Sequence, residues 1–226
     1  MQKVAIFDVD GTIFRSSLLI ELVDAFVEAN IFPQSIMETC EKSKTNWLNR
    51  EGGYIGAVVQ VFENNIKGIK QSDFIKIAEI VIQKQAKRTY TYTPKLIKDL
   101  KNQGYFILAV SQSPKMILDL FCSTLGFDKV YGRMYDVDSD GVLTGDTQNL
   151  DLIPFKDKVL QRALEKEGLT LDESVGVGDT EGDISFLSLV TNPICFNPNQ
   201  KLYQTAKENG WKVVVERKDV IFEIPN

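Results

Sequence analysis

The chain has 226 residues, of which 43% are hydrophobic and 25% charged, proportions that exclude a disordered or fibrous protein. Its 26 basic and 31 acidic residues give a net charge of −5, which argues against binding nucleic acid or an anionic membrane through bulk charge. The sequence contains no histidine, so histidine-based triads, histidine zinc sites and imidazole bases are excluded.

Cysteine use and the N-terminus bear on the cellular compartment. The three cysteines form no CxxC pair, so we expect buried free thiols rather than a disulfide framework or a zinc knuckle (Cys40, Cys122 and Cys195). The apolar run before Asp8 is only four residues long (4–7), too short for the core of a signal peptide, and no apolar run of ~18 residues follows. We therefore expect a soluble cytoplasmic protein with no membrane partner.

Short runs of β-branched and aromatic residues predict strands that are buried on both faces of a parallel sheet. These runs are residues 4–7, 105–110, 174–177, 193–196 and 212–215. Between them lie segments with helical periodicity, most of which end at a glycine: 94–103, 114–125, 156–167, 183–190 and 200–209. The alternation predicts an α/β fold with a Rossmann-like, three-layer, parallel-sheet core.

Residues 16–88 interrupt this alternation because they contain no convincing strand. Apolar residues at three- and four-residue spacing predict about four amphipathic helices there. We interpret this segment as a small helical cap inserted after the first strand, with residues 1–15 and 89–226 forming the core domain. The alternative is a set of additional helices packed on the sheet.

Residues 136–141 imitate the first half of a calcium-binding loop, because three aspartates alternate before Gly141. The twelfth position of that loop is Thr147 instead of glutamate, and the preceding residues do not have a helical pattern. Asp140 and Gly141 stand between two apolar runs, which predicts the turn of a β-hairpin instead.

Acidic residues follow two of the predicted buried strands. Asp8 and Asp10 come after the first strand, and residues two apart share one face of a strand. Asp179 and Asp183 follow the strand at 174–177. Ligands bind at the carboxyl ends of strands in open α/β sheets, and converging carboxylates without histidine or cysteine favour Mg²⁺.

These motifs resemble those of the haloacid dehalogenase-like phosphohydrolases, in particular subfamily IB with its phosphoserine phosphatase-like members. The string Asp8-Val9-Asp10-Gly11-Thr12 looks like the first motif of the family, and residues 178–183 resemble the fourth. Ser111 ends a predicted strand, as the second-motif serine does. Lys156 opens a predicted helix at the distance from Asp179 that phosphoserine phosphatase-like members show. The helical insertion is similar to their small cap.

The resemblance implies a Mg²⁺-dependent phosphomonoester hydrolase that acts on a small phosphorylated metabolite. Asp8 would become an aspartyl-phosphate, while Asp10 would protonate the leaving group and later deprotonate water. Mg²⁺ would be bound by Asp8, the backbone carbonyl of Asp10 and Asp179, with Asp183 orienting a bound water. The expected phosphate-binding residues are Gly11, Thr12, Ser111, Gln112 and Lys156.

Lys158 is the alternative to Lys156. Residues two apart on a helix point in different directions, so only one of the two lysines can face the site. The spacing to Asp179 favours Lys156.

Three departures from the family pattern argue against phosphoserine itself as the substrate. Ser17 stands where phosphoserine phosphatases carry a glutamate that binds the substrate ammonium. The segment Ser111-Gln112-Ser113-Pro114 lacks their Gly-Gly, and Gly182 replaces an asparagine.

Ser17 and Arg50 are the candidate substrate-binding residues. Arg50 would extend from the cap toward an anionic or polar leaving group, or would instead cap a helix C-terminus at the surface. Two other functions stay open: a phosphotransferase or mutase that uses the same aspartyl-phosphate, and a catalytically silent binding protein. The sequence does not predict the oligomeric state.

Overall fold

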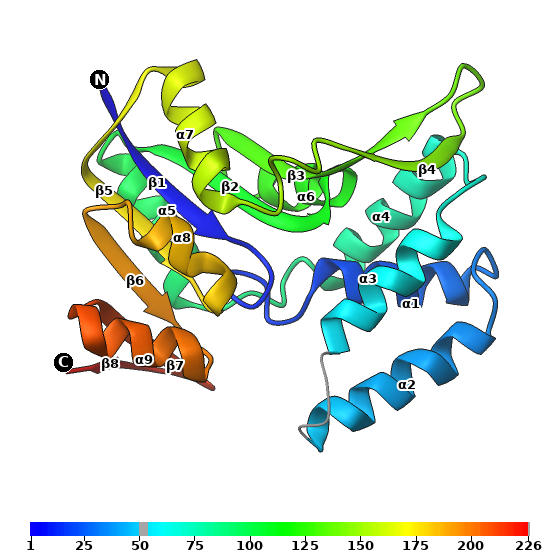
Figure 1. Ribbon diagram of the computed structural model, residues 1–226, viewed down its shortest axis with the longest axis horizontal. Coiled ribbons are helices and arrows are strands. Elements are labelled where there is room, and N and C mark those ends of the chain that lie inside the picture. The colour runs from blue at the N-terminus through cyan, green and yellow to red at the C-terminus, as the bar shows by residue number, and fades with distance from the viewer. Residues whose placement is uncertain (50–53, 226) are drawn as a thin grey trace.

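The computed structural model describes residues 1–49 and 54–225. Within these residues an eight-stranded sheet has the order β4-β3-β2-β1-β5-β6-β7-β8. The strands are β1 (Gln2–Asp8), β2 (Phe106–Pro114), β3 (Lys129–Val137), β4 (Leu143–Gln148), β5 (Leu169–Gly178), β6 (Asn192–Phe196), β7 (Lys212–Arg217) and β8 (Val220–Ile224). The six inner strands are parallel, and β4 and β8 pair antiparallel at the two edges (Figure 1).

Helices cover both faces of the sheet. Ala5 and Phe7 of β1 face α5 (Tyr92–Asn102) and α6 (Lys115–Ser123), with which they form one hydrophobic cluster. Val4 and Ile6 alternate to the opposite face and pack in a second cluster. The helices of that second cluster are α7 (Lys156–Glu167), α8 (Ile184–Leu187) and α9 (Gln200–Asn209). The predicted three-layer α/β core is confirmed.

All the strands predicted from apolar runs are present, but two regions differ from the sequence analysis. Residues 183–190 do not form one helix: a 3-10 turn (Glu181–Asp183) is followed by the single turn of α8. The side chain of Asp183 binds backbone N–H groups at the start of this turn, which favours a tight turn there. Strand β8 was not predicted, because most of its residues are exposed and its sequence shows no buried face.

The segment between β1 and β2 contains α1 (Leu18–Glu28), α2 (Ser35–Leu48), α3 (Tyr54–Asn65) and α4 (Gln71–Gln85), here called the cap helices. Figure 1 shows them gathered at one side of the sheet, near β4, and not on its two faces. Their buried side chains are continuous with the hydrophobic cluster under α5 and α6. The division into a cap of residues 16–88 and a core stays a prediction.

The predicted β-hairpin is present as β3 and β4. Its turn is closed by the Asp138 carboxylate, which accepts hydrogen bonds from the N–H groups of Asp140 and Val142 at 2.9 Å each. The hairpin also pairs with the loop between α3 and α4, since Leu143 exchanges backbone hydrogen bonds with Gly68 and Ile69. The hairpin therefore joins the sheet to the cap helices.

The two connections between the sheet and the cap helices run side by side. Arg15 N–H donates to the carbonyl of Arg88 at 2.8 Å, and Tyr90 N–H donates to that of Ile13 at 3.0 Å. The buried carboxylate of Glu216 in β7 pairs with Arg15 and accepts hydrogen bonds from the backbone N–H groups of Thr91 and Tyr92. One carboxylate thus fixes both connections to the sheet.

The three cysteines are buried free thiols, as predicted (Cys40, Cys122 and Cys195). Among the helices of residues 1–49 and 54–225, none has the length and apolar character needed to span a membrane.

An aromatic cluster holds the cap helices to one another and to the hairpin. Phe62 of α3 is fully buried, and its ring centroid lies 6.2–6.4 Å from those of Phe26 and Phe74 and 5.7 Å from that of Tyr135 in β3. Because its contacts come from two cap helices and the hairpin, Phe62 is central to their association.

Phe62→Ala is expected to lower the free energy of unfolding by about 3–5 kcal/mol, because it opens a cavity at this junction. Chemical denaturation measures the loss. Ile80→Ala is the matched control, since the Ile80 side chain on α4 is exposed, and we expect a change within about 0.5 kcal/mol. Equal losses in the two variants would contradict the role of Phe62.

Candidate active site

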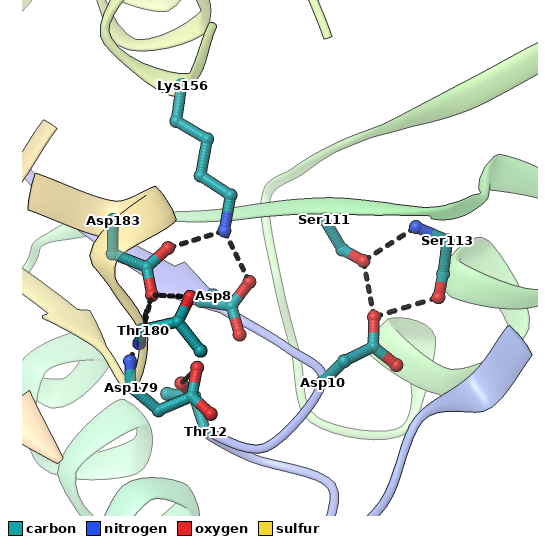
Figure 2. Close-up of polar contacts among 9 residues, drawn as sticks. All are labelled: Asp8, Asp10, Thr12, Ser111, Ser113, Lys156, Asp179, Thr180 and Asp183. Atoms are coloured by element: carbon teal, nitrogen blue, oxygen red, sulfur yellow. Dashed lines mark hydrogen bonds and ion pairs between the residues drawn. The ribbon is translucent and has the colours of Figure 1, made fainter. Parts of the chain in front are cut away.

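Three carboxylates meet at the carboxyl end of two neighbouring strands. Asp8 ends β1, Asp179 directly follows β5, and Asp183 ends the 3-10 turn. β1 and β5 are adjacent and parallel, so their carboxyl ends lie at the same edge of the sheet. One oxygen from each carboxylate lies within 4.8 Å of the other two (Figure 2).

Lys156 supplies a positive charge to this group. It is the first residue of α7, which covers the face of the sheet toward which Asp8 points, and its side chain is buried. Its Nζ lies 2.6 Å from Asp8 Oδ1 and 2.5 Å from Asp183 Oδ1. Burial opposes the charge of Lys156, but the two carboxylates prevail and raise its pKa above the usual value.

The other candidate lysine lies outside this group. Lys158 is exposed, and its Nζ contacts the carbonyl of Asp151 at 3.4 Å and stacks over the ring of Phe155. Of the two lysines, Lys156 is the one that reaches the carboxylates.

Burial is the main cause of the raised pKa values of Asp8 and Asp179. It raises the pKa of Asp8 to about 7, an effect that Lys156 opposes. Burial and the charges of Asp8 and Asp183 raise the pKa of Asp179 well above its usual value. A single ammonium group therefore does not balance the negative charge of this site.

The turn after β5 is organised by the Asp183 carboxylate. Asp183 Oδ2 accepts hydrogen bonds from the N–H groups of Asp179 and Thr180 at 2.9 and 3.0 Å. The turn packs against Gly178, at which a Cβ would lie 2.5 Å from the Cβ of Asp183. The glycine is therefore required for this close approach, which places Asp183 beside Lys156.

Gly11 and Thr12 bring the turn after β1 against Asp179. Gly11 has a φ of +83°, and a Cβ there would lie 2.2 Å from Asp179 Oδ2. The buried Thr12 side chain donates a long hydrogen bond of 3.4 Å to Asp179 Oδ1. Both residues thus lie against the Asp179 carboxylate. The sequence analysis predicts that the same two residues bind phosphate.

Asp10 belongs to a second polar group beside the first, as Figure 2 shows. Its Oδ1 accepts a hydrogen bond from the N–H of Leu18, at the start of α1, at 2.6 Å. Its Oδ2 accepts hydrogen bonds from the hydroxyls of Ser111 at 2.5 Å and Ser113 at 2.8 Å. The predicted role of Asp10 in metal binding concerned its backbone carbonyl, so this position of the carboxylate leaves that prediction untouched.

Three other residues were predicted for the site: Gln112, Ser17 and Arg50. The Gln112 side chain is exposed and accepts a hydrogen bond from Arg133 at 3.3 Å, so it does not join either group. Ser17 is buried directly before Leu18, whose N–H binds Asp10. Arg50 lies outside the described residues.

The sequence analysis did not identify Ser113 or the N–H of Leu18 as part of the site. Ser113 follows Ser111 by two residues, and this spacing on a strand is the signal that could have revealed it. The Leu18 contact depends on where the cap segment returns to the sheet, which local sequence does not specify.

The cluster formed by the carboxylates of Asp8, Asp179 and Asp183 fits a divalent cation. Asp8 Oδ2 is buried and has no hydrogen-bond partner among the residues that the structure describes. The donors of Asp8, Asp179 and Asp183 are all oxygens, the type that Mg²⁺ prefers, and a divalent ion would offset their excess negative charge.

Known proteins resemble this chain over most of its length. The model of the haloacid dehalogenase-like hydrolase family matches residues 5–188. A phosphoserine phosphatase from Methanocaldococcus jannaschii is 26% identical over 226 residues, which cover 97% of this chain and 94% of that protein.

Solved structures share the fold. A Bordetella pertussis protein with unknown function superposes with a TM-score of 0.78 at 17% identity, covering 94% of this chain and 98% of its own. A phospho-aspartyl intermediate analogue of phosphoserine phosphatase gives a TM-score of 0.66 at 23% identity, covering 96% and 95% of the two chains. Since the family match spans most of the sequence and includes the converging aspartates and Lys156, the chain belongs to the haloacid dehalogenase-like hydrolases, as a phosphatase of the phosphoserine phosphatase-like kind.

Proposed function

We propose that the protein is a Mg²⁺-dependent phosphomonoester hydrolase that acts through an aspartyl-phosphate on Asp8. The observation that carries this proposal is the environment of the Asp8 carboxylate. One of its oxygens binds Lys156, and the other is buried without a hydrogen-bond partner among the described residues. A carboxylate held in this way is oriented for attack on a group that enters the site.

In the first step, a carboxylate oxygen of Asp8 forms a bond to phosphorus while the bond from phosphorus to the ester oxygen breaks. The departing oxygen takes a proton from the Asp10 carboxyl group and leaves as an alcohol. Lys156 and the hydroxyl of Ser111 bind phosphoryl oxygens and stabilise the charge that moves onto them.

In the second step, the Asp10 carboxylate takes a proton from water as the water oxygen bonds to phosphorus. The bond between phosphorus and Asp8 breaks, which releases inorganic phosphate and restores the carboxylate of Asp8. Mg²⁺, when bound, supplies neutralisation of the carboxylates and of the phosphoryl oxygens. Asp8, the carbonyl of Asp10 and Asp179 would hold it, with Asp183 beside them.

The relatives support a small phosphorylated metabolite as substrate. One is named as a phosphoserine phosphatase, and one structural neighbour is named as an analogue of a phospho-aspartyl intermediate. Ser17, the segment after Ser111, and Gly182 depart from the phosphoserine phosphatase pattern, so we infer a substrate other than phosphoserine. We expect the enzyme to act in the cytoplasm, without a nucleic-acid or membrane partner.

Removal of the metal tests the proposed cofactor. Treatment with EDTA is expected to abolish hydrolysis of p-nitrophenyl phosphate, and excess Mg²⁺ is expected to restore it. The reason is that a cluster of three carboxylates repels a phosphate unless a cation offsets its negative charge. Release of p-nitrophenolate measures the reaction. Unchanged hydrolysis in EDTA would exclude a metal-dependent reaction.

Asp8→Asn is expected to lower kcat at least ~10³-fold, because the amide cannot form the aspartyl-phosphate. The same assay in the presence of Mg²⁺ measures this loss. Asp172→Asn is the control and should retain wild-type turnover, because it changes an exposed aspartate near the start of β5, away from the carboxyl end where the site lies. Substantial activity in Asp8→Asn would rule out Asp8 as nucleophile.

Lys156→Ala is expected to lower kcat/KM by ~10²–10³-fold, because it removes the ammonium group that, within residues 1–49 and 54–225, contacts Asp8. Lys158→Ala, two residues away on the same helix, should leave kcat/KM unchanged. Thermal unfolding of both variants establishes that they are folded under assay conditions. Similar kinetics in the two variants would contradict the assignment of Lys156.

A further inference from the structure

Ser113 contacts both Asp10 and Ser111 in the second polar group. It lies two residues after Ser111 on β2, and its side chain is buried. Its hydroxyl donates to Asp10 Oδ2 at 2.8 Å, and its backbone N–H donates to Ser111 Oγ at 2.9 Å (Figure 2). Ser113 therefore connects the proposed acid–base carboxylate with the proposed phosphate-binding hydroxyl.

We propose that Ser113 is a positioning residue that holds the Asp10 carboxylate in place once a phosphate is bound. The inference rests on the proposed function, in which Asp10 transfers protons and Ser111 binds the phosphoryl group. It adds a role for a residue outside the motifs named in the sequence analysis.

The two serine hydroxyls differ in whether a bound phosphate requires their hydrogen bond. A hydroxyl has a single proton to donate, and the Ser111 hydroxyl donates it to Asp10 Oδ2. When Ser111 donates to a phosphoryl oxygen, Oδ2 loses that hydrogen bond and, among the contacts of the described residues, keeps the one from Ser113. The Ser113 N–H holds the oxygen of Ser111 in both situations, so only the O–H bond of Ser111 has to rotate.

The remaining contacts would fix the plane of the Asp10 carboxylate. Oδ1 keeps the hydrogen bond from Leu18 N–H, and Oδ2 keeps the one from Ser113. Each oxygen has a further lone pair, which can carry the proton that is given to the leaving group or can accept a hydrogen bond from water. Without Ser113, no donor of the described residues contacts Oδ2 in the phosphate-bound state. The carboxylate can then pivot about the remaining hydrogen bond from Leu18 N–H to Oδ1.

The backbone favours this position of Ser113. A residue before proline is restricted to extended conformations, and Pro114 follows Ser113 at the end of β2. The extended backbone keeps Ser111 and Ser113 on one side of the strand. Phosphoserine phosphatases carry a Gly-Gly after the serine that Ser111 matches, so the pattern of those enzymes lacks the second hydroxyl that Ser113 supplies here.

The test compares two esters, because leaving groups differ in their need for a proton. In the first step an alkoxide must be protonated, whereas p-nitrophenolate leaves without a proton. We expect Ser113→Ala to lower kcat/KM for 2-phenylethyl phosphate roughly 10- to 100-fold, and that for p-nitrophenyl phosphate less than about threefold. Ser111→Ala, which removes a proposed phosphate-binding group, should lower both.

Ser113→Gly is a second variant, in case alanine disturbs the fold, and thermal unfolding identifies the variants that are folded. Equal losses for the two esters, or no loss for either, would overturn the inference while leaving the proposed function intact. If the wild-type protein hydrolyses neither ester in the presence of Mg²⁺, the proposed function fails instead, and the inference fails with it.

Discussion

The structure of the site depends on one buried ammonium group shared by two carboxylates. Lys156 contacts Asp8 and Asp183, and Asp179 lies beside them. Buried charges are costly unless they are paired, so the surrounding elements must be placed closely enough to pair them. The parallel pairing of β1 with β5 brings the strand ends together, and the start of α7 places the lysine. The negative charge that remains is suited to a divalent cation.

The two aspartates of the first motif have different environments although they are two residues apart. Asp8 lies among charged groups, next to Lys156, whereas Asp10 is bound by the hydroxyls of Ser111 and Ser113 and by a backbone N–H. Such a difference suits the two distinct roles that we propose, a nucleophile and a proton-transfer group. The contact with α1 also places Asp10 where the cap helices meet the sheet.

Sequence reasoning succeeded where local pattern and topology decide the structure. Parallel buried strands place the residues that follow them at one edge, which is why the proximity of Asp8 and Asp179 could be foreseen. It failed where contacts between distant segments decide. Strand β8 has no buried face to produce a pattern, and the 3-10 turn that ends at Asp183 reflects a side chain that binds the backbone just before it. The proposed role of Ser113 depends on its contact with Asp10, which lies 103 residues earlier in the chain.

The central claim is that phosphate is transferred to Asp8, and Asp10→Asn offers the most direct measurement. This variant cannot deprotonate water, but p-nitrophenolate can leave without an acid, so the intermediate should accumulate. After mixing with p-nitrophenyl phosphate and Mg²⁺, the quenched protein is reduced with borohydride and its peptides are analysed by mass spectrometry. The account predicts a burst of one p-nitrophenolate per protein molecule and conversion of Asp8 to homoserine. A burst with the modification at another residue, or continued turnover with Asp8 unmodified, would contradict it.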